Sequence, residues 1–293
     1  MQENTYQAGL AALEKGDLDE AINCFMATYQ AKKTFKVNYL LFETLEKAER
    51  YDNAAQIADD YVTDYLKDEA KFLEYVKVMV LAGQIRKIEM TLELVQAFFS
   101  EPQTKRLQVQ FEKTLAEVRS QEEIETLKKQ FKYLGANDVI GQREVFEKTK
   151  SLTIKEFEEL SQGPLLDPDV HVLLRSAILD ELRYLGSERE VEYLSFTKEV
   201  RSFIPAALKE LTDYLMYQRL TQLLATDSAI TPDLKEAALA EMTLKLQLLY
   251  PQLTRPFPEP EKLYRVLMDR PDEDEKEKEF AAELEKSLQA WEI

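Results

Sequence analysis

The turn sequence GDLDEA, residues 16–21, returns in related form as RYDNA at 50–54 and as GQIRKI at 83–88. An apolar residue follows each turn, at positions 18, 51 and 85, and another lies three residues later, at 21, 54 and 88. Spacings of 33 and then 34 residues are typical of helical repeats. One helix pair cannot bury its apolar face alone, so such pairs stack and leave a long concave surface. The pattern therefore predicts three stacked helix pairs within residues 3–99, and a binding scaffold.

The helical period of the apolar residues sets the expected helices. The first pair covers about 3–15 and 18–31, the second 36–48 and 52–66, and the third 69–82 and 85–99. Gly16 suits the reversal between the first two helices, because glycine enters a left-handed turn without a Cβ penalty.

The first copy resembles a tetratricopeptide repeat of the small bacterial type of unassigned function. It supplies Gly9 and the Ala21-x3-Phe25 pattern, whose small residues let two helices approach closely. The second copy keeps Ala54 but has Phe42 and Ala58, and the third has Val76, Ile88 and Leu92. The resemblance covers residues 1–100 and implies an all-α fold, an α-solenoid of antiparallel helix pairs. A nonrepeating helical bundle is the alternative.

The resemblance also implies a site, because the first helix of each pair lines the groove in that family. The candidate partner-binding residues are Tyr6, Leu10, Lys36, Tyr39, Glu43 and Lys77. Tyr6 and Leu10 stand where some relatives carry the Lys and Asn that clamp a terminal carboxylate, so chaperone-tail binding is not implied. A mixed aromatic and charged groove suits an extended or helical peptide. The alternative is that Tyr6 and Tyr39 pack between helices and the chain itself fills the groove.

The rest of the chain predicts further helices with weaker repetition. Residues 101–250 are interpreted as a divergent helical-repeat region, with helices near 188–201 and 204–226 among them, and 167–185 resembles half of a HEAT-type repeat. Gly135 and Gly186 end similar segments, as left-handed helix caps would. Residues 251–293 comprise a proline-rich connection, the acidic stretch 269–279 and a C-terminal helix.

Composition narrows the classes of partner. The net charge is −17 over 293 residues and is spread evenly, which disfavours binding to nucleic acid and to anionic membranes. Only 7 glycines and 10 prolines interrupt the helix-forming residues. With one cysteine, no visible secretory signal and no apolar run long enough for a membrane span, we expect a cytoplasmic protein.

Catalytic chemistry is not indicated. The single histidine, His171, and the single cysteine, Cys24, cannot form a Cys/His zinc site and are expected to be a boundary residue and a buried hydrophobe. No phosphate loop or nucleophile motif occurs, and the carboxylates of 272–275 fit a solvated helix N-terminus better than a calcium loop. We therefore expect no catalytic, cofactor-binding or metal-binding residues.

Three hypotheses for function follow. The first is a non-catalytic adaptor that binds a protein or peptide partner through the groove. The second is a structural protein that self-associates, for example as a homodimer, through the C-terminal helix that carries Trp291. The third, more remote, is a helical enzyme of unknown chemistry.

Overall fold

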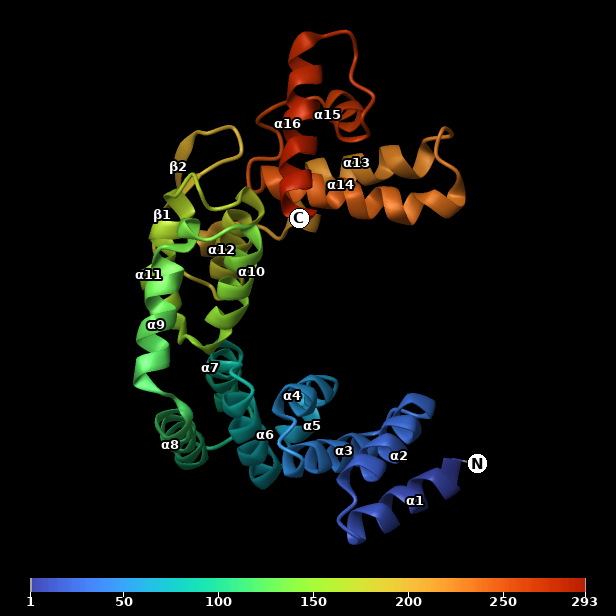
Figure 1. Cartoon of the computed structure of the whole chain (residues 1–293), viewed down its shortest axis with the longest axis vertical. Coiled ribbons are helices and arrows are strands. Elements are labelled where there is room, and N and C mark those ends of the chain that lie inside the picture. The colour runs from blue at the N-terminus through green and yellow to red at the C-terminus, as the bar shows by residue number, and fades with distance from the viewer. Residues whose placement is uncertain (1, 293) are drawn as a thin grey trace. The chain divides into compact units, whose positions relative to one another are not determined.

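Helices dominate the computed structural model, which describes residues 2–292. Sixteen α-helices and one two-stranded antiparallel sheet lie within that range (Figure 1), so the class is essentially all-helical as predicted. Contacts group the chain into two units. The N-terminal unit contains residues 1–124 and 150–154, and the C-terminal unit contains 125–149 and 155–293. The boundaries expected at 100 and 250 stay predictions.

The N-terminal unit follows the predicted helices closely. Its elements are α1 (Gln2–Glu14), α2 (Leu18–Ala31), α3 (Phe35–Lys47), α4 (Tyr51–Asp59), α5 (Val62–Tyr65), α6 (Glu69–Leu81), α7 (Ile85–Leu94), a 3-10 turn (Val95–Ala97) and α8 (Glu101–Val118). The helix expected over 52–66 is divided into α4 and α5, and the one expected over 85–99 ends at Leu94. Helices that follow one another pack together: α1 on α2, α2 on α3, α3 on α4 and α4 on α6.

The three turns quoted above share one structure. Gly16, Glu49 and Gly83 have φ angles of 78°, 57° and 67°. The amide of the next residue donates back across the turn in each copy, from Asp17 to Ala12, from Arg50 to Leu45 and from Gln84 to Met79, at 2.9 Å each time. This is the left-handed Schellman cap of a helix C-terminus. The second copy forms it with glutamate where the other two have glycine.

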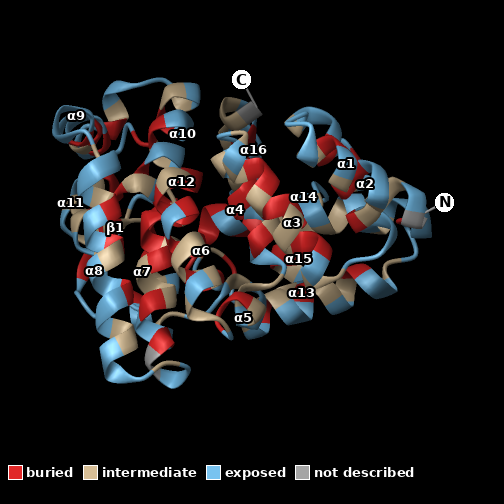
Figure 2. Cartoon of the chain, turned by 90° about the horizontal axis from the view of Figure 1, so that it is seen from below, coloured by how far each residue is buried: buried red, intermediate tan, exposed pale blue. Residues whose placement is uncertain are grey.

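Close packing of the first pair explains its small residues. A Cβ atom on Gly9 would lie 2.7 Å from Cε1 of Phe25, so α1 and α2 approach too closely there for any side chain. Ala21, Ala54 and Ile88, each three positions after the first apolar residue that follows its turn, are all fully buried. Figure 2 shows in red the buried residues along the helices. The predicted role of Gly9 and the Ala-x3-Phe pattern is confirmed.

Ion pairs join each helix pair to the next. Their partners are Arg50 with Asp19, Lys87 with Asp59, Lys77 with Glu46 at 2.8 Å, and Arg106 with Glu69 at 2.7 Å. Most of these side chains are substantially exposed, so each pair is worth at most about 1 kcal/mol.

The C-terminal unit is less regular. After α9 (Gln121–Lys132), which begins just before the unit boundary, come α10 (Val139–Lys148), α11 (Ile154–Leu166), α12 (Val172–Tyr184), β1 (Val191–Leu194), β2 (Val200–Phe203), α13 (Leu215–Thr226), α14 (Lys235–Leu249), α15 (Pro260–Leu267) and α16 (Glu275–Glu292). Its core gathers apolar residues mainly from α13 to α16.

Several predictions fail in this unit. The helix expected over 188–201 is wrong, because Val191–Leu194 pairs with Val200–Phe203 in a hairpin that buries Val191 and Tyr193. The helix expected over 204–226 begins only at Leu215, after two 3-10 turns, the first of them at Pro205–Ala207. The helix expected from 167 begins at Val172. Gly186 has a φ of 69° as predicted, whereas Gly135 lies in a 3-10 turn without a positive φ.

Candidate functional site

A cavity of about 430 Å³ opens between α1 and α3 in the N-terminal unit, and we call it the α1–α3 groove. Its walls are formed by Tyr6, Leu10, Phe35, Lys36, Tyr39, Leu40, Glu43 and Lys71. The structure thus brings together five of the six candidate residues. The sixth, Lys77, lies outside the lining, where its Nζ pairs with Glu46. The groove instead receives Lys71, which lies near the start of α6.

Helical spacing places these side chains together. Tyr6 and Leu10 are four residues apart on α1, and Phe35, Tyr39 and Glu43 follow at the same interval on α3. Residues four apart share one helix face. The groove therefore arises where the matching faces of the first helices of two successive pairs meet.

Both lysines of the groove lie over aromatic rings. Lys36 Nζ is 5.2 Å from the ring centre of Tyr6, and Lys71 Nζ is 5.1 Å from that of Tyr39. Lys71 also pairs with Asp68 at 2.8 Å. Lys36 has no ion pair anywhere in the part of the chain that the structure describes, which makes it the cation most available to a ligand.

The acidic side of the groove is partly desolvated. Burial, and then the neighbouring charge of Glu74, raise the pKa of the Glu43 carboxyl. The Tyr39 hydroxyl donates a hydrogen bond to Glu74, and burial together with this bond raises the pKa of Tyr39. A buried carboxylate attracts a hydrogen-bond donor more strongly than an exposed one, because water competes less for it.

Tyr6 and Tyr39 do pack against other rings of the fold, as the alternative of packing between helices predicts in part. The ring of Tyr6 packs against Phe25 at 6.1 Å between centres, and that of Tyr39 is stacked on Phe42 at 6.2 Å. Both residues are half-buried, and both line the groove. Both rings thus pack within the fold and also line the groove, and Tyr39 lies in addition against Phe35 and Tyr65, at 6.1 and 6.0 Å between ring centres.

A buried polar network that sequence reasoning missed holds α3 beneath the groove. Asn38 is fully buried and donates to the Ile57 carbonyl at 2.6 Å, while the Tyr65 hydroxyl donates to it at 3.1 Å. Tyr29 also contacts Asn38 and donates to Asp60 at 2.6 Å. Burial and the Asp60 bond raise the pKa of Tyr29 to about 12. An asparagine on an apolar helix face was the available signal.

The two residues considered for nucleophilic chemistry have structural roles. Cys24 is buried, and burial raises the pKa of its thiol, which is the opposite of an activated thiolate. His171 caps α12: its Nδ1 accepts from the Leu173 amide at 3.2 Å and its Nε2 lies 3.0 Å from the Ser287 carbonyl oxygen.

The acidic segment begins α16 as predicted, and its carboxylates pair with α15. Arg265 binds Asp272 at 2.7 Å, and Lys262 binds Asp274 at 3.2 Å. Within residues 2–292 no group of three or more His, Cys, Asp or Glu side chains could hold a metal ion. None of the described helices has the length and apolar character needed to cross a bilayer.

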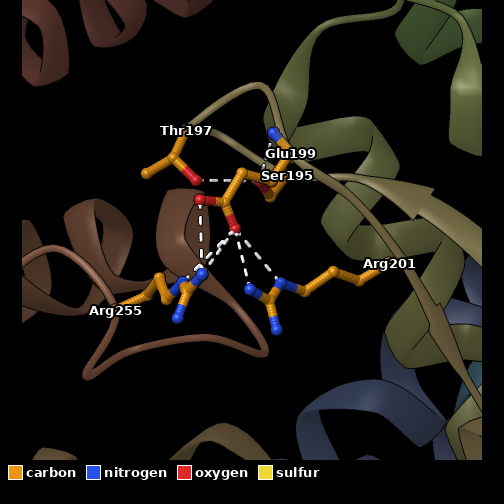
Figure 3. Close-up of polar contacts among 5 residues, drawn as sticks. All are labelled: Ser195, Thr197, Glu199, Arg201 and Arg255. Carbon is orange, nitrogen blue, oxygen red and sulfur yellow. Dashed lines mark hydrogen bonds and ion pairs between the residues drawn. The ribbon is translucent and has the colours of Figure 1, made fainter.

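A further polar cluster fastens the hairpin loop (Figure 3). The Glu199 carboxylate lies between two guanidinium groups, with Arg255 Nη2 at 3.1 Å and Arg201 Nη2 at 3.0 Å. Ser195 accepts from the Glu199 amide at 3.1 Å through its hydroxyl. Because Glu199 contacts both guanidinium groups and thereby joins the hairpin loop to Arg255, we interpret this cluster as an anchor for the hairpin.

Comparisons of the chain with protein families, with curated proteins and with solved structures found no match.

Proposed function

We propose that the N-terminal unit is a tetratricopeptide-like solenoid and that the protein is a non-catalytic scaffold, which binds a peptide segment of a protein partner in the α1–α3 groove. The observation that carries the proposal is the lining itself. Matching faces of α1 and α3 converge on one open cavity of about 430 Å³ that contains aromatic, aliphatic and charged side chains. Sites of this size and mixed character are suited to a few side chains of a ligand.

The geometry suggests how a peptide would lie. Leu10 and Leu40 offer an apolar surface between the two tyrosines, where one apolar or aromatic side chain of the ligand would be desolvated. Lys36, which forms no ion pair with any described residue, would attract an acidic group on one side, and Glu43 would accept a hydrogen bond from a donor on the other. These charges would set the orientation of the peptide more than its affinity.

The same proposal gives the protein no nucleic-acid partner and a cytoplasmic location. The support is the net charge of −17 and the single, buried cysteine.

The test uses the full-length protein and a displayed library of random peptides. A selected peptide would be synthesised with a fluorophore, and its Kd measured by anisotropy. Replacing Leu10 by Glu places a charge on the apolar wall and should weaken binding about tenfold or more, the effect of losing roughly 1.4 kcal/mol. Lys36→Glu should weaken the binding of peptides that contain an acidic residue and should leave the binding of their neutral analogues unchanged.

Lys77→Glu is the matched control for Lys36→Glu. Both lysines are exposed and carried by the first helix of a pair, but Lys77 lies outside the groove. Equal affinity of the wild-type protein and Lys77→Glu, with loss in Leu10→Glu at an unchanged melting temperature, would support the groove. Selection of peptides that bind Leu10→Glu as tightly as the wild-type protein would refute it.

A further inference from the structure

Arg175, in the second turn of α12, is a buried cation without a carboxylate partner. The residue is only 6% exposed. Its Nε donates to the Leu194 carbonyl at 2.9 Å, and its Nη1 donates to the carbonyls of Asp167, at 3.0 Å, and Val170. No ion pair with Arg175 occurs among residues 2–292. Burial lowers the pKa of the guanidinium, although the group stays protonated at neutral pH.

Burying the Arg175 guanidinium without a paired anion costs folding free energy unless a bound ligand supplies the missing negative charge. A buried charge that is not paired is strongly destabilising, and carbonyl dipoles offset only part of that cost. The three carbonyl bonds use Nε and Nη1 and fix the plane of the guanidinium. Nη2, the remaining nitrogen, makes no hydrogen bond within the described chain. A pre-oriented donor is thus left over on an immobilised cation.

This cation lines a cavity of about 430 Å³ in the C-terminal unit, which we call the Arg175 cavity. Apolar residues from separate segments form much of its wall, namely Val139, Val172, Leu194, Phe196 and Ala290. The first turn of α12 also borders it, so the positive end of that helix dipole adds to the charge of Arg175.

The remaining charges decide which anion fits. Lys198 and Lys286 line the cavity, and so do Asp169 and Glu283. Lys198 pairs with Glu283 at 3.4 Å, whereas Lys286 has no partner in the described chain. His171 contributes no positive charge, because its Nδ1 accepts from the Leu173 amide. Three lining cations therefore face two lining carboxylates, and the Asp167 carboxylate, which is not in the lining, also acts on Arg175 through its charge. This balance suits one negative charge better than two.

We propose that the Arg175 cavity binds a small organic monocarboxylate with an apolar body. The carboxylate lies against Arg175 Nη2, with Lys286 as the second, mobile cation, and the hydrocarbon or ring occupies the apolar wall. Guanidinium donors form strong charge-assisted hydrogen bonds with carboxylates. The apolar wall excludes water around that contact and strengthens it.

The experiment is isothermal titration of the full-length protein with octanoate, octanol, acetate and octyl phosphate. Octanoate should bind at one site per chain. Octanol, which lacks the charge, and acetate, which lacks the apolar body, should each bind about tenfold more weakly or worse, because a hydrogen bond between charged groups and the burial of several methylenes each exceed roughly 1.4 kcal/mol. Octyl phosphate should bind more weakly than octanoate near neutral pH.

Variants test the location without disturbing Arg175, whose removal threatens the fold. Lys286→Glu should weaken octanoate several-fold. Lys278→Glu is the matched control, because Lys278 is an exposed lysine on the same helix outside the cavity and should leave octanoate binding unchanged. Octanol that binds as tightly as octanoate, octyl phosphate that binds more tightly, or equal effects of the two lysine variants would each overturn the proposal. So would the absence of octanoate binding at millimolar concentration.

Discussion

The α1–α3 groove and the Arg175 cavity have the same volume, about 430 Å³, but are built in different ways. The groove repeats one helix face, carried by α1 and again by α3, and its cations are exposed or half-exposed lysines. The Arg175 cavity draws on four separate segments, around residues 139, 168–175, 194–198 and 283–290, and its central cation is buried. A repeated face makes a site from local pattern, whereas the cavity exists only once distant segments have folded together.

The central cations of the two sites also differ in how much they contribute to the stability of the fold. Among the described residues, the Lys36 side chain makes a cation–π contact with Tyr6 and no ion pair. Arg175 ties the chain before α12 to the end of β1 through its carbonyl bonds. We therefore expect a substitution of Lys36 to cost the fold little and a substitution of Arg175 to destabilise it.

The largest effect should come from removing the buried cation. Arg175→Leu removes the guanidinium donors of the Val170 and Leu194 carbonyls and leaves the Asp167 carbonyl with the Val170 amide alone. It should lower the free energy of unfolding by about 3 kcal/mol or more. Lys36→Leu, the corresponding change in the groove, should alter it by less than about 0.5 kcal/mol. Urea denaturation of both variants measures the contrast, and similar losses would remove the distinction drawn here.

A smaller effect tests the packing on which the repeated face depends. Ala21 is fully buried on the helix that approaches Gly9, so Ala21→Trp should overpack the first pair at a cost of about 1–3 kcal/mol. Ala27 is exposed on the same helix, and Ala27→Trp is the control. If denaturant curves show a loss of only a few tenths of a kcal/mol for Ala21→Trp, close packing at that position is wrong.

The second turn, which has Glu49 where the other two have glycine, offers a modest gain in the free energy of unfolding. Glu49 has a φ of 57°, which strains any residue with a Cβ, so Glu49→Gly should raise the free energy of unfolding by about 0.5–1 kcal/mol. Gly16→Ala and Gly83→Ala should show the opposite sign. Thermal melts of the three variants measure this, and a destabilised Glu49→Gly would mean that the glutamate side chain contributes more than the turn strain costs.

The smallest effect is the pH dependence of stability that comes from His171, which lines the Arg175 cavity. Burial lowers the pKa of His171 below its ordinary 6.5, so the unfolded chain binds the proton first as pH falls. The neutral imidazole contributes its full stability above pH 6.5, the ordinary pKa of the unfolded chain. This contribution is lost as the pH falls from 6.5 through the lower pKa of the folded state.

His171→Asn keeps a side-chain acceptor for the helix cap and removes the titration. Denaturation at pH 7.5 and pH 5.5 should show a greater relative loss for the wild-type protein than for this variant. An identical pH dependence of the two would show that His171 keeps its ordinary pKa in the folded state.

How far the sequence predicted these features depends on whether they are local. The turns near 16, 50 and 83 follow from the repeat spacing, whereas the close approach of Gly9 to Phe25 and the five groove residues follow from the resemblance to tetratricopeptide repeats. Lys77 lies outside the groove, whose lining contains Lys71 from the first turn of α6 instead. The strand Val191–Leu194 was mistaken for helix because its pairing with Val200–Phe203 is what decides its conformation. The carbonyl partners of Arg175 are likewise set by tertiary structure. In the sequence, its place within an apolar stretch was the only available sign that this charge is buried.

The ion pairs between successive helix pairs bear on how the N-terminal unit unfolds. Each of them, from Arg50 with Asp19 to Arg106 with Glu69, spans one step of the array and no more. In a linear array, cooperativity comes from the energy that couples neighbours rather than from the stability of each member. Exposed charges are screened by salt, while the apolar packing inside each pair is not. Added salt should therefore weaken only the ion-pair part of the coupling, because one apolar core runs from α1 to α8 and also joins each helix pair to the next.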